Sequence, residues 1–452
     1  MIYARQALLA SGWAQDVRIT LHDGRIDQIA VNTAAQPDDV RVDTLLPALG
    51  NLHSHTFQRA MAGMTEFRMA GRDSFWTWRE LMYRFMDRLT PEQIEAIAAL
   101  VFVEMQEAGY SSVGEFHYVH HQRGGAPYDA LAELSLRVMA AAGDTGIGLT
   151  HLPVLYTYGG AGQKPLDQGQ LRFGNDVDRF ADLVQGARAG LADLPDDARV
   201  GIAPHSLRAT SPDDLARALA DHQGGPVHIH ISEQPKEVED IQTWLGARPV
   251  EWLLANAPVN KDWCLIHATH MTDAETRAMA ASGAVAGLCP ITEANLGDGP
   301  FNGPTYLEAG GAFGIGSDSN INISLTEELR TLEYSQRLRD MARNVMVVGE
   351  GSVGATLYTG SARGGAQALG RDAGEIAQGR LADLVAIDST DPTLCALTPD
   401  QILDGLCFAA KDTVITDLWS AGRHNVTGGR HIARDAVVSR YRSAVSDLLA
   451  SL

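Results

Sequence analysis

The sequence has few cysteines and no long apolar run. Its four cysteines, Cys264, Cys289, Cys395 and Cys407, are widely spaced and form no CxxC pair, which argues against a disulfide scaffold and favours a reduced compartment. No apolar run approaches the roughly 18 residues that cross a membrane, and the N-terminus lacks a secretory h-region with its cleavage site. We therefore expect a cytoplasmic protein that does not enter a membrane.

Basic residues are also scarce. There are 36 Lys and Arg against 56 Asp and Glu, a formal net charge of −20. Such a field repels nucleic acid and anionic membranes, so the expected partner is a small molecule. An anionic substrate would then need a locally positive pocket.

Short apolar runs alternate with amphipathic helical stretches, the pattern of parallel strands joined by crossover helices. One helix is marked at its start by Thr90 and Gln93 at capping-box spacing around Pro91. Eight such units predict an α/β fold of the TIM-type (β/α)8 class, whose catalytic groups project from the carboxyl ends of the strands. The eight runs are 45–52, 111–116, 147–154, 199–204, 226–231, 263–267, 284–288 and 313–317.

The two ends of the chain share strand-like sequence patterns. Residues 1–46 show strand alternation with a turn at Asp23-Gly24, and residues 369–452 contain two further strand-like segments before a C-terminal helix. Neither end can build a core alone, so we expect them to form one discontinuous β-sandwich domain beside a barrel over 47–368. The Gly-rich loop 156–165 could be a lid over a substrate or an ordinary connection.

Histidines stand at the end of the first barrel run. His53 and His55 lie two apart, so on a strand both imidazoles point the same way and can reach one metal ion. Alone this signal is weak, because 15 histidines in 452 residues supply about half an HxH by chance.

Other strand ends carry matching residues. His230 ends the fifth run, His267 ends the sixth, and Asp318 follows the eighth, all on the face where barrel sites form. Three histidines and an aspartate suit one zinc ion, with iron(II) as the alternative, and His267 is either a polarising group or a fourth nitrogen ligand. A carbamylated lysine bridging two metals is disfavoured, because no lysine precedes Lys164, which lies in the Gly-rich loop.

Glu233 follows His230 by three residues in HISE. This spacing selects His230 over His228 as the ligand and places a carboxylate beside the metal for proton transfer, although a solvated loop acid is the alternative. Asp318 would accept a proton from the attacking water, and His267 would polarise the water or the tetrahedral centre. The expected chemistry is metal-assisted hydrolysis.

The motifs HSH, HISE, IHATH and GSDSN resemble the mononuclear deaminase branch of the amidohydrolase superfamily. A closer resemblance, to the formimidoylglutamate deiminase family of histidine degradation, rests on five segments. They are NLHSHTFQRAMAGMTE (51–66), SFWTWRELMY (74–83), GEFHYVHH (114–121), PHSLRA (204–209) and VHIHISEQ (227–234). Thr56 stands where that family often has Ala.

This resemblance implies hydrolysis of N-formimidoyl-L-glutamate to N-formyl-L-glutamate and ammonia by a homo-oligomer, expected to be a dimer. It implies that a metal is held by His53, His55, His230 and Asp318, with Glu233 and His267 in proton transfer. It also implies that the substrate is bound by Gln58, Arg79, Tyr118, His205 and Arg208.

Two arginines fit a dicarboxylate substrate, because guanidinium groups bind carboxylates bidentately and stay charged. Arg208 follows the fourth strand, and Arg79 lies in an aromatic segment with Phe75, Trp76, Trp78 and Tyr83. Each arginine could instead form a surface ion pair, and the aromatics could be local core. Two rival functions remain: a deaminase or ring hydrolase for a purine, pyrimidine or imidazolone, and a non-catalytic barrel scaffold.

Overall fold

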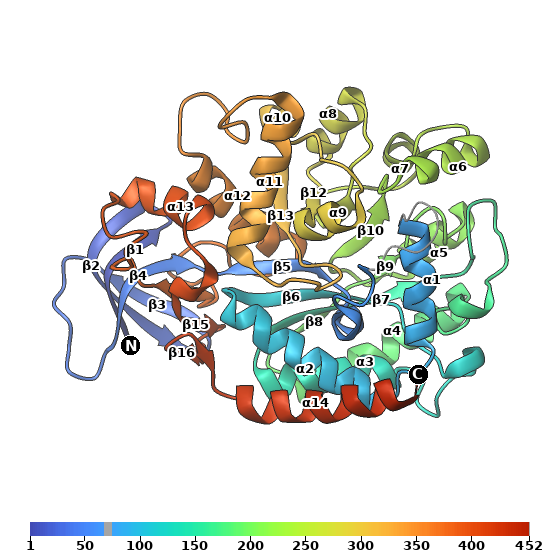
Figure 1. Cartoon of the computed structure of the whole chain (residues 1–452), viewed down its shortest axis with the longest axis horizontal. Coiled ribbons are helices and arrows are strands. Elements are labelled where there is room, and N and C mark those ends of the chain that lie inside the picture. The colour runs from blue at the N-terminus through green and yellow to red at the C-terminus, as the bar shows by residue number, and fades with distance from the viewer. Residues whose placement is uncertain (67–74, 452) are drawn as a thin grey trace.

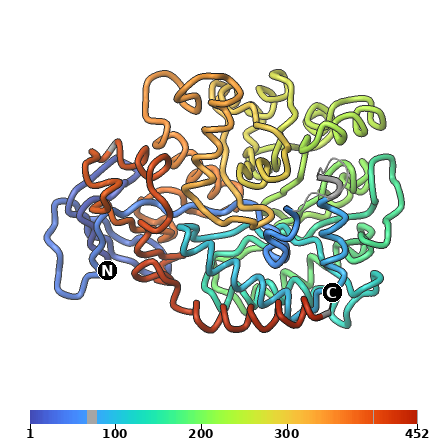
Figure 2. Tube along the Cα trace, viewed as in Figure 1, coloured from blue at the N-terminus to red at the C-terminus, as the bar shows by residue number. Residues whose placement is uncertain are grey.

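The computed structural model describes residues 1–66 and 75–451. A mixed sheet built from both ends of the chain lies beside a larger α/β barrel (Figure 1). The N-terminus lies in the mixed sheet, whereas the C-terminal helix ends on the far side, beneath the barrel (Figure 2). Within the described residues, no helix is both long and apolar enough to cross a membrane.

The small sheet has the strand order β17-β16-β15-β14-β4-β1-β2-β3. Its strands are β1 (Ile2–Leu9), β2 (Gly12–His22), β3 (Arg25–Ala30), β4 (Val40–Pro47), β14 (Leu384–Ile387), β15 (Ile415–Ser420), β16 (Arg423–Thr427) and β17 (Arg430–His431). The end strand β3 returns to the segment before β14, since Ile26 N donates to Arg380 O (2.9 Å) and Ala382 N to Gly24 O (2.9 Å). The sheet thus folds over on itself around one apolar cluster from both chain ends, which confirms the predicted joint β unit.

The barrel consists of two arcs of parallel strands, β5-β6-β7-β8 with β9 beside β7, and β10-β11-β12-β13. They are β5 (Leu49–Ser54), β6 (Tyr110–His117), β7 (Gly148–Leu155), β8 (Arg199–Val200), β9 (Ala203–Pro204), β10 (Val227–Ile231), β11 (Trp263–His267), β12 (Val285–Leu288) and β13 (Ala312–Ile315). Isolated bridges join the arcs, Ile202 to Val227 and Ser206 to His230 on one side and Ser54 to Asp318 on the other. The predicted α/β barrel class is confirmed.

The first predicted barrel run, 45–52, is two strands. β4 ends at Pro47 in the small sheet, and β5 begins at Leu49 in the barrel. Between them Ala48 N donates to Asp383 O (3.0 Å). The expectation of one strand was wrong because residues Leu45 to Leu52 are buried on both sides of the junction, so hydrophobicity gives no signal where the chain changes sheets.

Helices cover the outside of the barrel. They are α1 (Phe75–Met86), α2 (Pro91–Glu107), α3 (Glu133–Thr145), α4 (Val177–Ala189), α5 (Pro212–Asp221), α6 (Pro235–Leu245), α7 (Pro249–Asn256), α8 (Asp273–Ser282), α9 (Pro290–Leu296), α10 (Gly303–Glu308), α11 (Leu325–Asp340), α12 (Val353–Ala368), α13 (Pro399–Phe408) and α14 (Arg434–Ser451). The predicted capping box of α2 is present: Thr90 Oγ1 accepts from Gln93 N (3.3 Å), and Gln93 Oε1 accepts from Thr90 N (3.0 Å). α14 packs along α2 below the barrel (Figure 1).

A buried ionic network ties the small sheet to the barrel. Arg371 donates to both oxygens of Asp383 (2.9 and 3.0 Å) and to Asp197 Oδ2 (3.0 Å), and its side chain is 1% exposed. Arg423 of β16 donates to both oxygens of Asp197 (2.7 and 2.9 Å). Asp197 belongs to the barrel and Asp383 precedes β14, so these ion pairs fix how the two parts meet.

Candidate active site

A pocket opens at the carboxyl ends of the barrel strands. The predicted site residues that line it are His55, Gln58, Arg79, Tyr118, His205, Arg208, His230, Glu233, His267 and Asp318. His53, the remaining predicted residue, is fully buried at the end of β5 and contacts His230 and Asp318. The structure therefore brings together all the residues predicted to bind metal, transfer protons or bind substrate.

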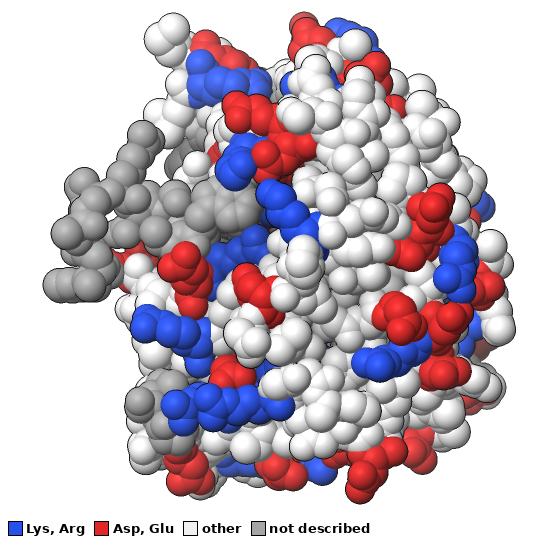
Figure 3. All heavy atoms as spheres, turned by 90° about the vertical axis from the view of Figure 1, so that its right-hand side faces the viewer, with Lys and Arg blue, Asp and Glu red and all other residues white. Residues whose placement is uncertain are grey.

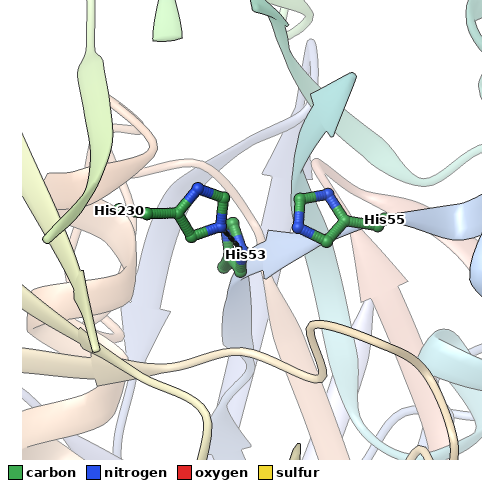
Figure 4. Close-up of side chains that lie close together, drawn as sticks. All are labelled: His53, His55 and His230. Carbon is green, nitrogen blue, oxygen red and sulfur yellow. Dashed lines mark hydrogen bonds between the residues drawn. The ribbon is translucent and has the colours of Figure 1, made fainter. Parts of the chain in front are cut away.

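Imidazole nitrogens converge at the bottom of this pocket (Figure 4). His53 Nε2 lies 3.1 Å from His230 Nε2 and 3.5 Å from Asp318 Oδ1, and His55 Nε2 lies 3.4 Å from the same oxygen. His267 joins His53 and Asp318 in a second, overlapping group, so the geometry also permits the alternative in which it is a ligand.

The outer nitrogens of two histidines fix the rings. His55 Nδ1 is 2.8 Å from Phe116 O and His230 Nδ1 is 3.1 Å from His205 O. Because a carbonyl only accepts, each Nδ1 carries the hydrogen and each Nε2 presents a lone pair to the pocket. Three nitrogens and one carboxylate oxygen, all buried, match the donors that a divalent transition metal takes.

Burial and mutual proximity set the charge of this cluster. Burial lowers the pKa of His53 to about 3 and also lowers the pKa values of His55 and His230. Burial alone would raise the pKa of Asp318, but the neighbouring His53, His55 and His267 outweigh it and hold this pKa well below its usual range. The site thus presents neutral imidazoles and an ionised carboxylate, the forms that bind a metal.

Asp318 is held by backbone and side-chain hydrogen bonds. Its N donates to His53 O (2.9 Å), and its O accepts from His55 N (2.9 Å). The Asp318 backbone has a φ of 46°, a left-handed conformation that aspartate tolerates better than most residues. Asn320 Nδ2 donates to Asp318 O (3.1 Å) and to Ser54 Oγ (3.1 Å). The sequence analysis missed Asn320, although its place in GSDSN was a signal.

His267 lies between carboxylates. Its Nε2 is 3.8 Å from Glu233 Oε1 and 3.9 Å from Asp318 Oδ2, and its Nδ1 is 3.2 Å from Glu293 Oε1. Burial by itself would lower the pKa of His267, but Glu293, Glu233 and Asp318 outweigh it and raise this pKa to about 10. Glu233 is 5% exposed, so the alternative of a solvated loop acid is wrong.

Arg208 forms an ion pair, but within the pocket rather than on the surface. Its Nη2 donates to Glu233 Oε2 (2.9 Å), and its Nε lies 3.7 Å from Glu237 Oε2. Glu237 accepts from the backbone N of Ser232 and of Glu233 (3.1 Å each). Sequence analysis missed Glu237, whose only signal is its position in the first turn of α6 after HISE.

Arg79 also lines the pocket. It donates to Tyr156 Oη (2.9 Å) and to Tyr83 Oη. Burial would lower the pKa of Arg79, but Tyr156 and Tyr83 outweigh it and raise this pKa. Trp78 and Tyr83 line the pocket, so these two aromatics are not only local core. Ser74 and the side chains of Phe75 and Trp76 lie outside the described residues.

Gln58, Tyr118 and His205 complete the walls near the predicted metal ligands. Gln58 Nε2 donates to Tyr118 Oη (2.9 Å), and the Tyr118 ring lies 4.8 Å from that of His55. His205 Nδ1 is 3.0 Å from Ser206 Oγ. The Gly-rich loop also reaches the pocket through Gly159, Gly160, Ala161 and Lys164, and Gly159 N donates to Lys164 O (2.7 Å).

Comparison with known proteins identifies relatives of this chain. The amidohydrolase family matches residues 44–424, and the N-terminal domain of formimidoylglutamate deiminase HutF matches residues 1–43. A formimidoylglutamate deiminase of Pseudomonas aeruginosa is 48% identical over 451 residues, which cover 99% of each chain. A 5-methylthioadenosine/S-adenosylhomocysteine deaminase of Natronomonas pharaonis is 28% identical, over 91% of this chain and 86% of its own.

Solved structures show the same fold. The crystal structure of an amidohydrolase from Brucella melitensis has a TM-score of 0.95 and 49% identity, with 99% of each chain covered. An adenosine deaminase from Xanthomonas campestris with bound zinc has a TM-score of 0.81 at 22% identity, over 99% of this chain and 98% of its own.

The chain therefore belongs to the amidohydrolase family of metal-dependent hydrolases. Within that family, its N-terminal segment and its full-length relative assign it to the formimidoylglutamate deiminases.

Proposed function

We propose that this chain hydrolyses N-formimidoyl-L-glutamate to N-formyl-L-glutamate and ammonia, a reaction of histidine degradation, with one zinc ion per subunit. The observation that carries the proposal is the pocket itself, which combines a histidine and carboxylate cluster with the guanidinium groups of Arg79 and Arg208. A dicarboxylate requires such cations. The full-length Pseudomonas relative, named for this activity, supports the same substrate.

His53, His55, His230 and Asp318 would hold the metal ion, because their ligand atoms converge in the pocket. When bound there, a divalent ion lowers the pKa of a water molecule toward neutrality and supplies a nucleophile at physiological pH. Iron(II) satisfies the same donor set as zinc.

The protein's own residues then move protons. Asp318 accepts a proton from the attacking water while the water oxygen bonds to the formimidoyl carbon. The C=N π electrons move to the terminal nitrogen, which takes a proton from Glu233. The proton held by Asp318 then passes to the same nitrogen, the bond between carbon and that nitrogen breaks, and ammonia leaves. The remaining hydroxyl proton returns to Glu233 as the formyl C=O forms. His267, between Glu233 and Asp318, stabilises charge on the tetrahedral centre.

Arg79 and Arg208 both line the pocket, and we assign one substrate carboxylate to each. Gln58, Tyr118 and His205, which line the pocket beside the predicted metal ligands, would orient the substrate. The proposal includes a cytoplasmic location, in keeping with the four free cysteines of the described chain. It also includes a homo-oligomer, expected to be a dimer, in keeping with the family resemblance.

The test is ammonia release by zinc-loaded protein. N-formimidoyl-L-glutamate is compared with N-formimidoyl-L-aspartate, adenosine, guanine, cytosine and S-adenosylhomocysteine at equal concentrations. Preferential turnover of the glutamate compound supports the proposal. Release only from a heterocycle overturns the substrate and leaves a deaminase of another kind, and release from none of them by metal-loaded protein overturns the reaction as well.

Glu233→Gln tests the proton donor. A glutamine keeps the size of the side chain but cannot deliver a proton, so we expect kcat to fall by a factor on the order of 100 or more. Metal analysis should show an unchanged metal content. Near-normal turnover with full metal content would remove Glu233 from the mechanism.

A further inference from the structure

Glu293 lies behind His267, on the side away from the pocket's other carboxylates. It belongs to α9, which follows β12, and it is 6% exposed. Its Oε1 is 3.2 Å from His267 Nδ1 and accepts a hydrogen bond from Cys289 N (2.9 Å). The same oxygen therefore caps the start of α9 and contacts the imidazole.

The contact with Glu293 determines which nitrogen of the His267 ring faces the reacting centre. Glu293 Oε1 acts as a hydrogen-bond acceptor, so His267 Nδ1 carries the hydrogen in this contact. The other ring nitrogen, Nε2, then faces Glu233 Oε1 at 3.8 Å and Asp318 Oδ2 at 3.9 Å. A buried carboxylate that fixes the tautomer and orientation of a catalytic imidazole is worth several orders of magnitude in hydrolases of other folds.

The helix that carries Glu293 is itself anchored to the site. Thr292 Oγ1 lies 2.9 Å from Ser319 Oγ and donates to Ser317 O (3.3 Å). Ser317 and Ser319 flank Asp318, so α9 is tied to the segment that carries the predicted metal ligand. The position of Glu293 relative to His267 is therefore set by rigid contacts on both sides.

We propose that Glu293 is a positioning residue that holds His267 with Nδ1–H toward the protein and Nε2 toward the reacting centre. This inference rests on the proposed function, because His267 acts there on the tetrahedral centre. It assigns to Glu293 no contact with substrate or metal.

Two substitutions separate orientation from packing. Glu293→Gln keeps an oxygen that the Cys289 N–H anchors and that can still accept from His267 Nδ1–H, so we expect kcat to stay within about tenfold of wild type. Glu293→Met keeps the bulk but offers no acceptor, and we expect kcat to fall by about 100-fold. KM and metal content should change by less than a few-fold in both variants.

A double-mutant cycle with His267→Asn tests whether Glu293 acts through His267. If it does, adding Glu293→Met to His267→Asn lowers kcat no further. A further drop equal to that of the single variant would overturn the inference, because it would show that Glu293 only supports the helix.

Glu328 provides the matched control. Its carboxyl group is fully buried and accepts a hydrogen bond from Ile291 N of α9 (2.9 Å), the helix that carries Glu293. Glu328 has no role in the proposed mechanism. We expect Glu328→Gln to keep kcat within about twofold. If it lowers kcat as much as Glu293→Met does, loss of support for α9 explains both results and the inference fails.

A measurement without substrate separates this inference from the proposed function. In protein labelled with 15N-histidine, the signals absent from His267→Asn identify His267. We expect its Nδ1 to carry a hydrogen in the wild type and the Nδ1 signal to change in Glu293→Met. An unchanged pattern overturns the inference whatever the enzyme's substrate is. Inactivity of the wild type on N-formimidoyl-L-glutamate, with the expected pattern present, overturns only the proposed function.

Discussion

Replacing Arg208 by Met tests how the pocket recognises its substrate. The substitution keeps an apolar stem of similar length and removes the guanidinium group. In the structure that group donates to Glu233 (2.9 Å) and lies 3.7 Å from Glu237. The variant therefore loses a cation for a substrate carboxylate and, at the same time, the partner of the proposed proton donor.

The expected magnitude follows from one lost hydrogen bond between charged groups. Such a bond contributes about 1.5–3 kcal/mol, and each 1.36 kcal/mol is tenfold in rate. We therefore expect kcat/KM for N-formimidoyl-L-glutamate to fall by about 10-fold to 150-fold. A loss carried by substrate binding appears mainly in KM, whereas a loss carried through Glu233 appears mainly in kcat.

The assay is steady-state ammonia release with three substrates: the parent compound and two analogues, each lacking one carboxylate. If Arg208 binds a substrate carboxylate, the wild type should already have a low kcat/KM for the analogue that lacks that carboxylate. Arg208→Met should lower kcat/KM for this analogue little further. An equal loss of kcat/KM for all three substrates would refute this role and leave Arg208 as a partner of Glu233 alone. Arg248→Met, which removes an ion pair to Glu275 (2.7 Å) outside the pocket lining, should leave kcat/KM within about twofold.

Three further expectations concern the metal and the junction of the two parts. Chelation of the metal should abolish ammonia release. Zinc at about 100 times its Kd should restore the activity and raise the free energy of unfolding by about 2.7 kcal/mol. Activity that survives verified metal loss would contradict the metal site. Arg371→Met should lower the free energy of unfolding by about 3–5 kcal/mol in guanidinium titrations, because it leaves buried carboxylates unpaired. Adding Asp383→Asn should recover part of that loss. A loss below about 1 kcal/mol for Arg371→Met would contradict the role of this ion pair. Burial alone would raise the pKa of Asp197, but Arg423 and Arg371 outweigh it and lower this pKa. Its contribution to stability is therefore complete above its unfolded pKa of about 3.9 and disappears as the pH falls through the lower folded value, so Asp197→Asn should flatten the acid limb of the stability curve.

The candidate metal ligands could be predicted from the sequence because barrel geometry makes strand ends meet. His53, His55, His230 and Asp318 are up to 265 positions apart, yet each ends or follows a strand. Parallel strands in a barrel place all these ends on one face. Residue type and position along a strand were therefore sufficient, without knowledge of side-chain contacts.

Residues on helices could not be predicted in this way. Glu237 and Glu293 lie in α6 and α9, where an acidic residue near the start of a helix is expected for capping alone. Whether such a side chain also meets Arg208 or His267 depends on how the helix is set against the barrel. Similarly, the sequence indicated Arg208 as a cation for substrate but gave no sign that Glu233 is its partner.

The overall charge of the protein and the charge of its substrate are compatible because they act over different distances. The net charge of −20 is spread over the surface, and the face in Figure 3 carries acidic and basic side chains side by side. At physiological salt, exposed charges are screened beyond about 8 Å, whereas buried charges are screened much less. Arg79, Arg208, Lys164 and Lys236 line the pocket, so an entering dicarboxylate responds mainly to these nearby cations. The same reasoning excludes a polyanion as substrate, because a polyanion would extend over the acidic surface outside the pocket.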